Sequence, residues 1–211
     1  MMKTLLNFIL LSLLAVGTAF ANDDELYDPA PPADSAFVRV INAAAGAEAT
    51  AVKVGDYSFG QLAYPAISPY SIVKQGEYDV VIGAATQKVT IEAGNYYTIA
   101  HTADSKIVPL QDELLSNPAK ARVYFYNISD APKAELMASD HGKAILADVA
   151  SSTGNSREVN ALKLNLQVKA GDVVVNDYAD VQLKRRVGTS FVLTGKAGAY
   201  KSLMVENEVK R

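Results

Sequence analysis

Short runs of alternating apolar and polar residues, separated by turn residues, fill the chain from Ala36 onward. Clear examples are residues 50–54, residues 78–82 and residues 162–168. Alternation with a period of two is typical of a strand with one buried face. Breaks at intervals near ten residues, several of them at glycine, are typical of antiparallel sandwiches and barrels. The pattern therefore predicts an all-β protein.

One of these strand patterns occurs twice. Residues 35–42 (SAFVRVIN) and residues 122–127 (RVYFYN) both combine β-branched and aromatic residues and both end on an asparagine. Weaker matches connect residues 89–99 with residues 181–193. Such a repeat indicates a duplication, so we predict two tandem antiparallel β-sandwich domains joined by a short linker. Val38 and Val40 should face the core of the first domain.

The chain divides into five predicted segments. The start carries Lys3, an apolar run over residues 5–16 and Ala19-Phe20-Ala21, which together resemble a cleaved secretory signal. The run is shorter than the roughly 20 apolar residues of a spanning helix. We assign residues 1–21 to the signal peptide, 22–35 to an extended acidic, proline-rich arm, 36–113 to the N-terminal sandwich, 114–120 to the linker and 121–211 to the C-terminal sandwich.

The signal peptide places the expected product outside the cytoplasm, most simply in a bacterial periplasm. Because the sequence has no cysteine, the product must fold there without disulfides. In the arm, Leu26 and Tyr27 are the only large apolar residues, and they either pin the arm to its own domain or dock a partner. The one weak helical pattern, at residues 110–115, leads into the linker.

Charge is distributed unevenly. Residues 22–113 carry five basic and thirteen acidic side chains, whereas residues 114–211 carry fourteen basic and ten acidic ones. The densest basic cluster, Lys184, Arg185 and Arg186, precedes Gly188 at an expected hairpin turn, and it is either a solvated turn or a polyanion-binding site. The overall charge of −3 is too small to indicate a nucleic-acid partner.

Catalytic and cofactor motifs are missing from the sequence. Neither Gly-x-Ser-x-Gly nor Gly-Asp-Ser occurs, and the two histidines, His101 and His141, fall in different predicted domains. Two separate histidines without cysteine make a zinc site improbable, and no calcium loop or phosphate-binding glycine loop is present. We therefore expect no catalytic residues, no metal, no cofactor and no enzymatic activity.

Two features leave a binding role open. Residues 151–160 are polar and lead into a strand, on which Arg157 and Glu158 should project to opposite sides. This segment is either a loop tied down by its own side chains or a binding loop. The tyrosines could also stack on sugar rings, although such residues are more often half-buried in a core. The candidates for exposure are Tyr57, Tyr64, Tyr70, Tyr96 and Tyr124.

Three segments in order resemble the AlgF family of alginate biosynthesis proteins: residues 26–29 (LYDP), 35–42 (SAFVRVIN) and 156–160 (SREVN). The resemblance implies a periplasmic two-domain β-sandwich protein that is needed for O-acetylation of alginate without being known as the transferase. Its partners would be the periplasmic alginate O-acetyltransferases and the membrane-bound O-acyltransferase complex.

We accordingly expect a non-catalytic adaptor. The predicted partner-binding residues are Leu26, Tyr27, Arg39, Asn42, Arg157, Glu158 and Asn160. The alternative is a carbohydrate-binding module, in which the basic second half, including Lys184, Arg185 and Arg186, contacts the uronate polymer.

Overall fold

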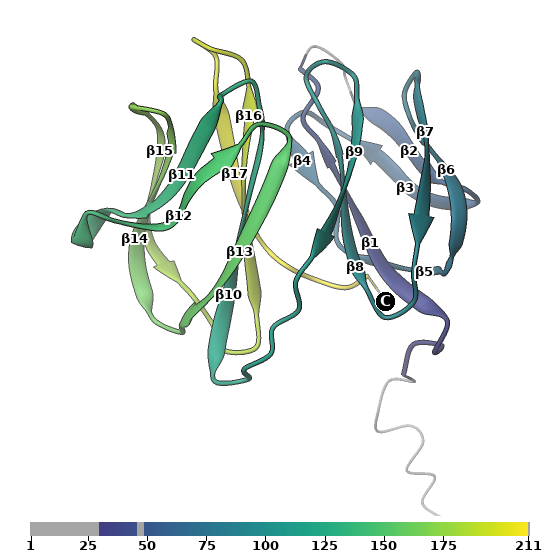
Figure 1. Ribbon diagram of the computed structural model, residues 1–211, viewed down its shortest axis with the longest axis horizontal. Coiled ribbons are helices and arrows are strands. Elements are labelled where there is room, and N and C mark those ends of the chain that lie inside the picture. The colour runs from purple at the N-terminus through teal and green to yellow at the C-terminus, as the bar shows by residue number, and fades with distance from the viewer. Residues whose placement is uncertain (1–29, 46–48, 211) are drawn as a thin grey trace, which may run out of the picture. The chain divides into compact units, whose positions relative to one another are not determined.

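The alternating runs form strands that are grouped in four sheets (Figure 1). The computed structural model describes residues 30–45 and 49–210. The strands of the N-terminal half are β1 (Ser35–Asn42), β2 (Thr50–Val54), β3 (Tyr57–Leu62), β4 (Ala66–Ile67), β5 (Ser71–Lys74), β6 (Gly76–Ile82), β7 (Ala85–Ile91), β8 (Tyr96–His101) and β9 (Ile107–Asp112).

The C-terminal half contains a second set of strands and one short 3₁₀ helix. They are β10 (Lys120–Ser129), β11 (Lys133–Ala138), η2 (Ser139–His141), β12 (Lys143–Ala150), β13 (Thr153–Asn160), β14 (Lys163–Ala170), β15 (Val173–Gln182), β16 (Gly188–Gly195) and β17 (Lys201–Glu206). Both halves lie in one compact unit that begins at Pro32. The all-β prediction is confirmed.

The two halves have the same topology. In the N-terminal half one sheet has the order β4–β1–β8–β9, with β5 also pairing β1, and the other has the order β3–β2–β6–β7. In the C-terminal half the corresponding orders are β13–β10–β16–β17 and β12–β11–β14–β15. Each half also contains one parallel pair, β1 with β8 and β10 with β16, within otherwise antiparallel sheets. This agreement supports the duplication that the repeated strand pattern indicated.

Each half has its own core. Val38 and Val40 of β1 are fully buried in the N-terminal core, as predicted, and Val123 and Phe125 of β10 are fully buried in the C-terminal core. A third apolar cluster combines residues of both halves. It contains Ile41, Ala43, Ala100, Tyr124, Tyr126, Ile128 and Val192. Successive residues of a strand point to opposite faces, so β1 and β10 each contribute one face to a core and the other face to this shared cluster.

Two local predictions were wrong. Residues 107–112 form strand β9 rather than the start of a helix at residue 110, and their burial alternates as expected for a strand. The basic cluster at residues 184–186 does not form a hairpin turn, because β15 pairs with β14 while β16 pairs with β10 and β17. It belongs to a connection between two different sheets of the C-terminal half.

The predicted signal peptide, residues 1–21, and the arm up to residue 29 lie outside the described residues. Within the described part of the chain, no helix is long and apolar enough to cross a membrane.

Candidate functional site: the contact between the two halves

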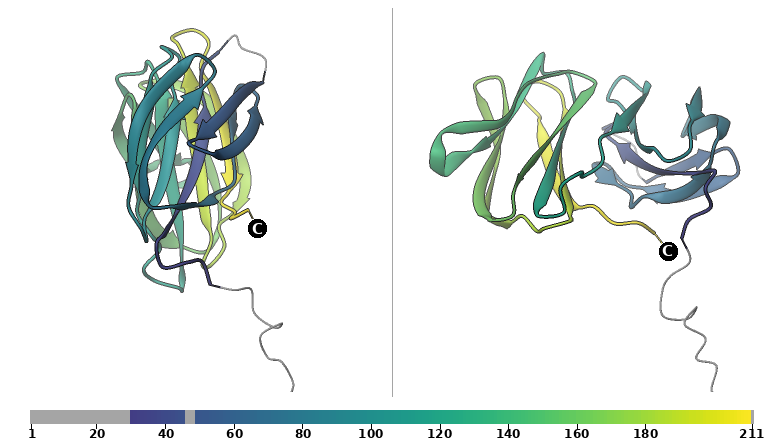
Figure 2. Two further views of the ribbon diagram at one scale, coloured as in Figure 1. Left: turned by 90° about the vertical axis from the view of Figure 1, so that its right-hand side faces the viewer. Right: turned by 60° about the horizontal axis from the view of Figure 1, so that its bottom comes forward.

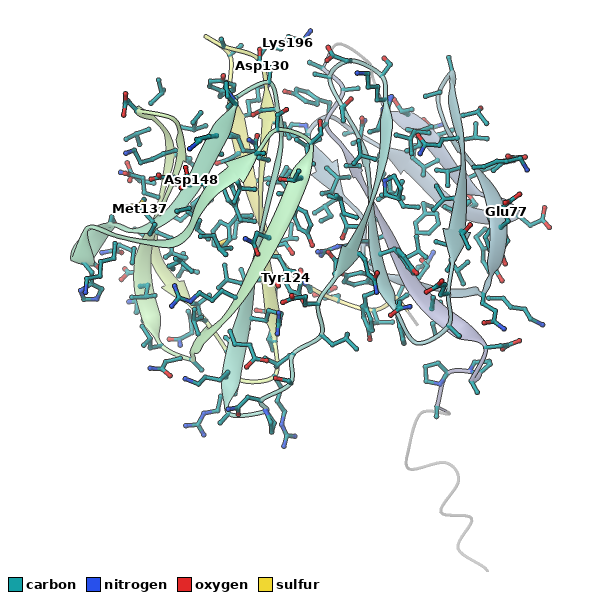
Figure 3. All side chains as sticks on the ribbon, in the orientation of Figure 1. Glu77, Tyr124, Asp130, Met137, Asp148 and Lys196 are labelled. Atoms are coloured by element: carbon teal, nitrogen blue, oxygen red, sulfur yellow. The ribbon has the colours of Figure 1, made fainter. Side chains whose placement is uncertain are left out.

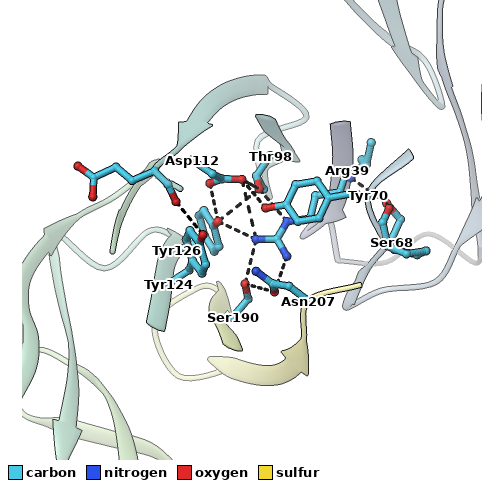
Figure 4. Close-up of polar contacts among 12 residues, drawn as sticks. Arg39, Ser68, Tyr70, Thr98, Asp112, Tyr124, Tyr126, Ser190 and Asn207 are labelled. Carbon is cyan, nitrogen blue, oxygen red and sulfur yellow. Dashed lines mark hydrogen bonds and ion pairs between the residues drawn. The ribbon is translucent and has the colours of Figure 1, made fainter. Parts of the chain in front are cut away.

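The buried polar cluster between the two halves is centred on Arg39 (Figure 4). Arg39 lies on β1 and is only 1% exposed. Its Nε donates to Thr98 Oγ1 at 2.8 Å, within its own half. Its terminal nitrogens reach the other half, where Nη1 donates to Asn207 Oδ1 at 2.7 Å and Nη2 donates to Tyr126 Oη at 2.7 Å and to Ser190 Oγ at 2.9 Å. One side chain of the N-terminal half therefore binds three side chains of the C-terminal half.

Asp112, at the end of β9, supplies the negative charge of this cluster. Its Oδ2 lies 4.0 Å from Arg39 Nη2 and accepts a hydrogen bond from Tyr70 Oη at 2.7 Å, while Oδ1 accepts from Tyr126 Oη at 2.6 Å. The Arg39 guanidinium also lies over the Tyr70 ring, 4.3 Å from its centroid. A buried charge is tolerated when it is paired and its remaining polar atoms are hydrogen-bonded, and this arrangement meets both conditions.

The tyrosines and Arg39 of this cluster keep one protonation state at neutral pH. Burial raises the pKa of Tyr70 and of Tyr126 well above the ordinary tyrosine value, although Arg39 acts in the opposite direction on both. Burial raises the pKa of Tyr124 to about 12. For Arg39, burial lowers the pKa, but Tyr126, Tyr70 and Asp112 outweigh that effect and the net pKa is raised. The tyrosines therefore stay neutral and Arg39 stays charged at neutral pH, so they hold the halves together rather than exchange protons.

The segment after β17 also joins the two halves. It leaves the C-terminal half and runs along the N-terminal half (Figure 2). The backbone N–H of Tyr70 donates to the Glu208 carbonyl at 2.8 Å, and the Lys210 N–H donates to the Tyr70 carbonyl at 2.6 Å. Asn207, which binds Arg39, lies in this same segment. The segment therefore fixes the residue that completes the buried cluster.

A second polar group lies where the chain passes from one half to the other. Arg122 of β10 donates to Glu113 Oε2 at 2.6 Å, to Ser156 Oγ at 2.8 Å and to Glu158 Oε1 at 3.1 Å. Glu158 also accepts hydrogen bonds from the backbone N–H and hydroxyl of Ser116. These bonds to Ser116, together with Arg122, lower the pKa of Glu158 to about 2. The linker is thereby tied to the C-terminal half.

A small cavity of about 150 Å³ separates this group from the Arg39 cluster. Its lining is largely polar and includes Asp112, Glu113, Tyr126 and Ser156. Tyr124, on the side of β10 toward β9, also lines it and donates its hydroxyl proton to the Glu113 carbonyl at 2.7 Å (Figure 3). No group of three or more His, Asp or Glu side chains suited to a metal ion occurs among residues 30–45 and 49–210.

The sequence of this chain matches a known protein family. The model of the family described as "Alginate O-acetyl transferase AlgF" matches residues 8–189. The chain belongs to the AlgF family. The matched region includes both sandwiches up to the start of β16 and most of the Arg39 cluster, but not Ser190 or Asn207.

Curated relatives of this AlgF-family chain all carry the name "Alginate biosynthesis protein AlgF". The protein of Pseudomonas fluorescens is 31% identical over 91% of this chain and 87% of its own length. That of Pseudomonas aeruginosa is 29% identical over 93% and 90%, and that of Azotobacter vinelandii is 25% identical over 90% and 86%. A solved structure of the C-terminal domain of AlgF from P. aeruginosa matches 42% of this chain and 99% of its own, at 29% identity and a TM-score of 0.39.

The predicted partner-binding residues of this AlgF-family chain are scattered. Leu26 and Tyr27 lie outside the described residues. Arg39 and Asn42 are buried, and their polar atoms are used inside the molecule. They hold structure in place here and offer nothing to a partner at the surface.

The other three predicted partner-binding residues, Arg157, Glu158 and Asn160, lie on β13 but not on one surface. Arg157 and Asn160 line an open groove of about 590 Å³ between β12 and β13, whereas Glu158 lies on the opposite face and binds Arg122 and Ser116. The predicted divergence of Arg157 and Glu158 is confirmed.

All three residues of the basic cluster, Lys184, Arg185 and Arg186, are exposed. Lys184 Nζ forms an ion pair with Glu206 at 2.8 Å, and Arg186 lines a groove of about 510 Å³ beside Tyr96 and Leu114. The structure does not bring this cluster together with the other predicted residues.

The tyrosines proposed for sugar stacking are mostly unavailable. Tyr70 and Tyr124 are 3% and 7% exposed and belong to the contact between the halves. Tyr96 stacks on Phe37 with ring centroids 4.2 Å apart, and Lys201 lies over the ring of Tyr64. His101 is buried beside Asn42, with His101 Nδ1 3.4 Å from Asn42 Oδ1, and burial lowers the pKa of His101.

Sequence reasoning missed Thr98, Asp112, Ser190 and Asn207, which surround Arg39. The signal that could have found them is the repeat itself, because these residues form two equivalent pairs. Thr98 pairs with Leu110, two residues before Asp112, and Ser190 pairs with Val205, two residues before Asn207. Strands of different length in the two halves shift the spacing of equivalent residues along the chain, which hid the correspondence.

Proposed function

We propose that this AlgF-family protein is a non-catalytic periplasmic adaptor for the O-acetylation of alginate. It bridges the periplasmic alginate O-acetyltransferases and the membrane-bound O-acyltransferase complex. The family description and the names of the relatives support a role in alginate biosynthesis and O-acetyl transfer.

The observation that carries the adaptor role is the buried, hydrogen-bonded contact between the two halves. An adaptor must hold two binding surfaces at a fixed separation, and the buried Arg39 cluster with the segment after β17 supplies such a connection. The opposite charge balance of the halves gives them different electrostatic surfaces for different partners.

A non-catalytic role is supported by the surroundings of the histidines. A serine nucleophile requires a base within hydrogen-bond reach. In the described part of the chain, the hydrogen-bond partner of the His101 ring is Asn42 rather than a serine. His141 lies at the end of η2 in the other half.

Co-purification tests this proposal. The mature chain, carrying an affinity tag, is expected to retain the purified periplasmic acetyltransferases of the same bacterium, and a strain lacking it should make under-acetylated alginate. In a separate reaction, the purified chain with an acetyl ester donor and oligomannuronate should transfer no acetyl group detectable by mass spectrometry. Acetyl transfer by the chain alone would overturn the non-catalytic role, and normally acetylated polymer in the deletion strain would overturn the adaptor role.

Uronate binding is the second candidate, favoured by the position of Arg186. This exposed cation lines the groove of about 510 Å³ beside Tyr96 and Leu114, so a uronate carboxylate could meet a positive charge there. Titration of the mature chain with oligomannuronate at low ionic strength, where charge attraction is strongest, tests this candidate. Absence of binding under these conditions would exclude it. An Arg186→Glu variant should lose any binding that uses this groove.

A further inference from the structure

The open groove between β12 and β13 is a second distinctive surface of the molecule. The two strands are edge strands of different sheets, β13 next to β10 and β12 next to β11. They are joined by a tight turn at Ser151 and Ser152. Toward the other ends of the two strands lies a groove of about 590 Å³, lined on β12 by Lys143 to Ile145 and on β13 by Arg157, Val159 and Asn160. The groove therefore lies along the open side of the C-terminal sandwich.

The edge of β13 is suited to accept another strand. It pairs with β10 over eight consecutive residues without a register shift. The backbone groups on its other side are therefore arranged regularly, which is what an added strand requires. Two related edges are interrupted instead: β12 has register shifts in its pairing with β11, and Pro69 separates β4 from β5 in the N-terminal half. The edge of β13 is thus regular, whereas the equivalent edge of the N-terminal half, formed by β4 and β5, is interrupted.

The groove combines an apolar lining with unpaired positive charge. Ile145, Val159, Leu162 and Leu164 contribute apolar side chains, and Leu162 is 39% exposed. Lys143 and Arg157 contribute cations, and no Asp or Glu lines the groove. Arg157 Nη1 donates only to the Ile145 carbonyl, at 3.3 Å, among the contacts found in the described part of the chain. A guanidinium bound to one backbone carbonyl keeps most of its donors available for a carboxylate.

These features determine the chemistry of the occupant. A strand lying along β13 would direct alternate side chains toward the groove, so a matching segment has apolar residues for Ile145 and Leu164 and carboxylates for Arg157 and Lys143. Pairing with a second copy of β13 would bring the Arg157 residues of two chains close together, and like charges at close range oppose that pairing.

We propose that the groove between β12 and β13 is the docking site for an extended acidic segment of a protein partner, which adds a strand to the edge of β13. The proposal rests on the adaptor function and assigns this surface to the acetyltransferase partner. Recognition combines main-chain hydrogen bonds along β13 with ion pairs to Arg157 and Lys143.

Charge reversal in the groove tests the assignment. The probe is the set of purified periplasmic acetyltransferases, and the variant is the full mature chain with Arg157→Glu and Lys143→Glu. The matched control reverses two exposed lysines of the N-terminal half, Lys53→Glu and Lys106→Glu. The groove variant should bind at least about tenfold more weakly, whereas the control should stay within about threefold of the parent chain.

Hydrogen exchange supplies a readout that a general charge effect would not change. Backbone amides of residues 153–160 should exchange more slowly in the complex than in the free chain, and those of the β3 edge should not. If the parent chain binds but the groove variant binds equally well and residues 153–160 gain no protection, the docking site is wrong while the adaptor function stands. If the parent chain binds no acetyltransferase, both proposals fall. A concentration-dependent dimer that the groove variant abolishes would assign the groove to a second copy and overturn the proposal.

Discussion

The two halves of the molecule use their repeated asparagines in the same way. Asn42 Nδ2 donates to the carbonyls of Leu62 and Ala63, and its Oδ1 accepts from the Ala44 N–H at 3.3 Å. Asn127 Nδ2 donates to the carbonyls of Ala131 and Val149, and its Oδ1 accepts from the N–H of Ser129 at 3.3 Å. Each asparagine, near the end of the first strand of its half, thus satisfies backbone groups that the sheets leave unpaired.

The contact between the halves is where equivalent positions diverge. On β1, Arg39 pairs with Thr98; at the same position on β10, Tyr124 pairs with Ser190. Thr98 and Ser190 both bind Arg39, and so do the equivalent residues Asp112 and Asn207. Two arginines at these facing positions would place like charges together in the interior. The asparagines therefore have the same backbone role in both halves, whereas the side chains that face each other across the contact differ.

The largest effect is expected from Arg39→Met. The change removes four hydrogen bonds and leaves the Asp112 carboxylate buried without its cation, which costs about 3–5 kcal/mol in comparable buried pairs. Because the lost contacts join the halves, urea unfolding should separate into two transitions.

A second substitution serves as the control for Arg39→Met. Adding Asp112→Asn to this variant should recover part of the lost stability, because the unpaired charge is then gone. A single transition with a loss below about 1 kcal/mol would show that the cluster does not hold the halves together.

A medium effect is expected when either repeated asparagine is removed. Asn42→Ala and Asn127→Ala each leave buried backbone groups without partners, at a cost of about 1–3 kcal/mol. Hydrogen exchange should show the N-terminal half opening more easily in the first variant and the C-terminal half in the second. If one substitution is neutral while the other is costly, the two asparagines are not equivalent.

The smallest effect is expected from Glu158→Gln, which should change how the stability of the folded chain depends on pH. The pKa of Glu158 is lowered to about 2, so its ionised form is favoured in the folded chain. The resulting stability is present above the ordinary value of 4.5 and is lost as the pH falls from there toward about 2. Glu158→Gln should therefore flatten the decline in melting temperature over this range. The matched control is Glu77→Gln, which removes an exposed carboxylate beside Lys88. If melting temperature falls with pH equally steeply in the parent chain and in the Glu158 variant, Glu158 does not contribute this pH-dependent stability.

More of the fold than of the candidate site could be predicted from the sequence. Alternation along β1 correctly placed Val38 and Val40 in the core, and the matching asparagines of β1 and β10 indicated a repeat that the shared topology supports. Alternation cannot show whether the second face of a strand meets solvent or another sheet. Arg39 was therefore expected at the surface, although that face lies against the other half.

The residues around Arg39 could not be found from spacing alone. Equivalent residues lie 85 positions apart at Asn42 and Asn127, 92 apart at Thr98 and Ser190, and 95 apart at Asp112 and Asn207. Most strands of the second half are longer than their counterparts in the first, so a fixed offset loses the correspondence. Only the strand register recovers it.

The shared apolar cluster makes the contact between the halves independent of protein concentration. Ile41 and Tyr126, Ala43 and Ile128, and Ala100 and Val192 are equivalent pairs that all lie in it, so the halves meet through the same face, as the subunits of a symmetric dimer do. Two separate subunits would dissociate on dilution. The short linker between Asp112 and Lys120 makes the same encounter intramolecular, with an effective concentration on the order of millimolar. The contact therefore stays closed however dilute the protein is.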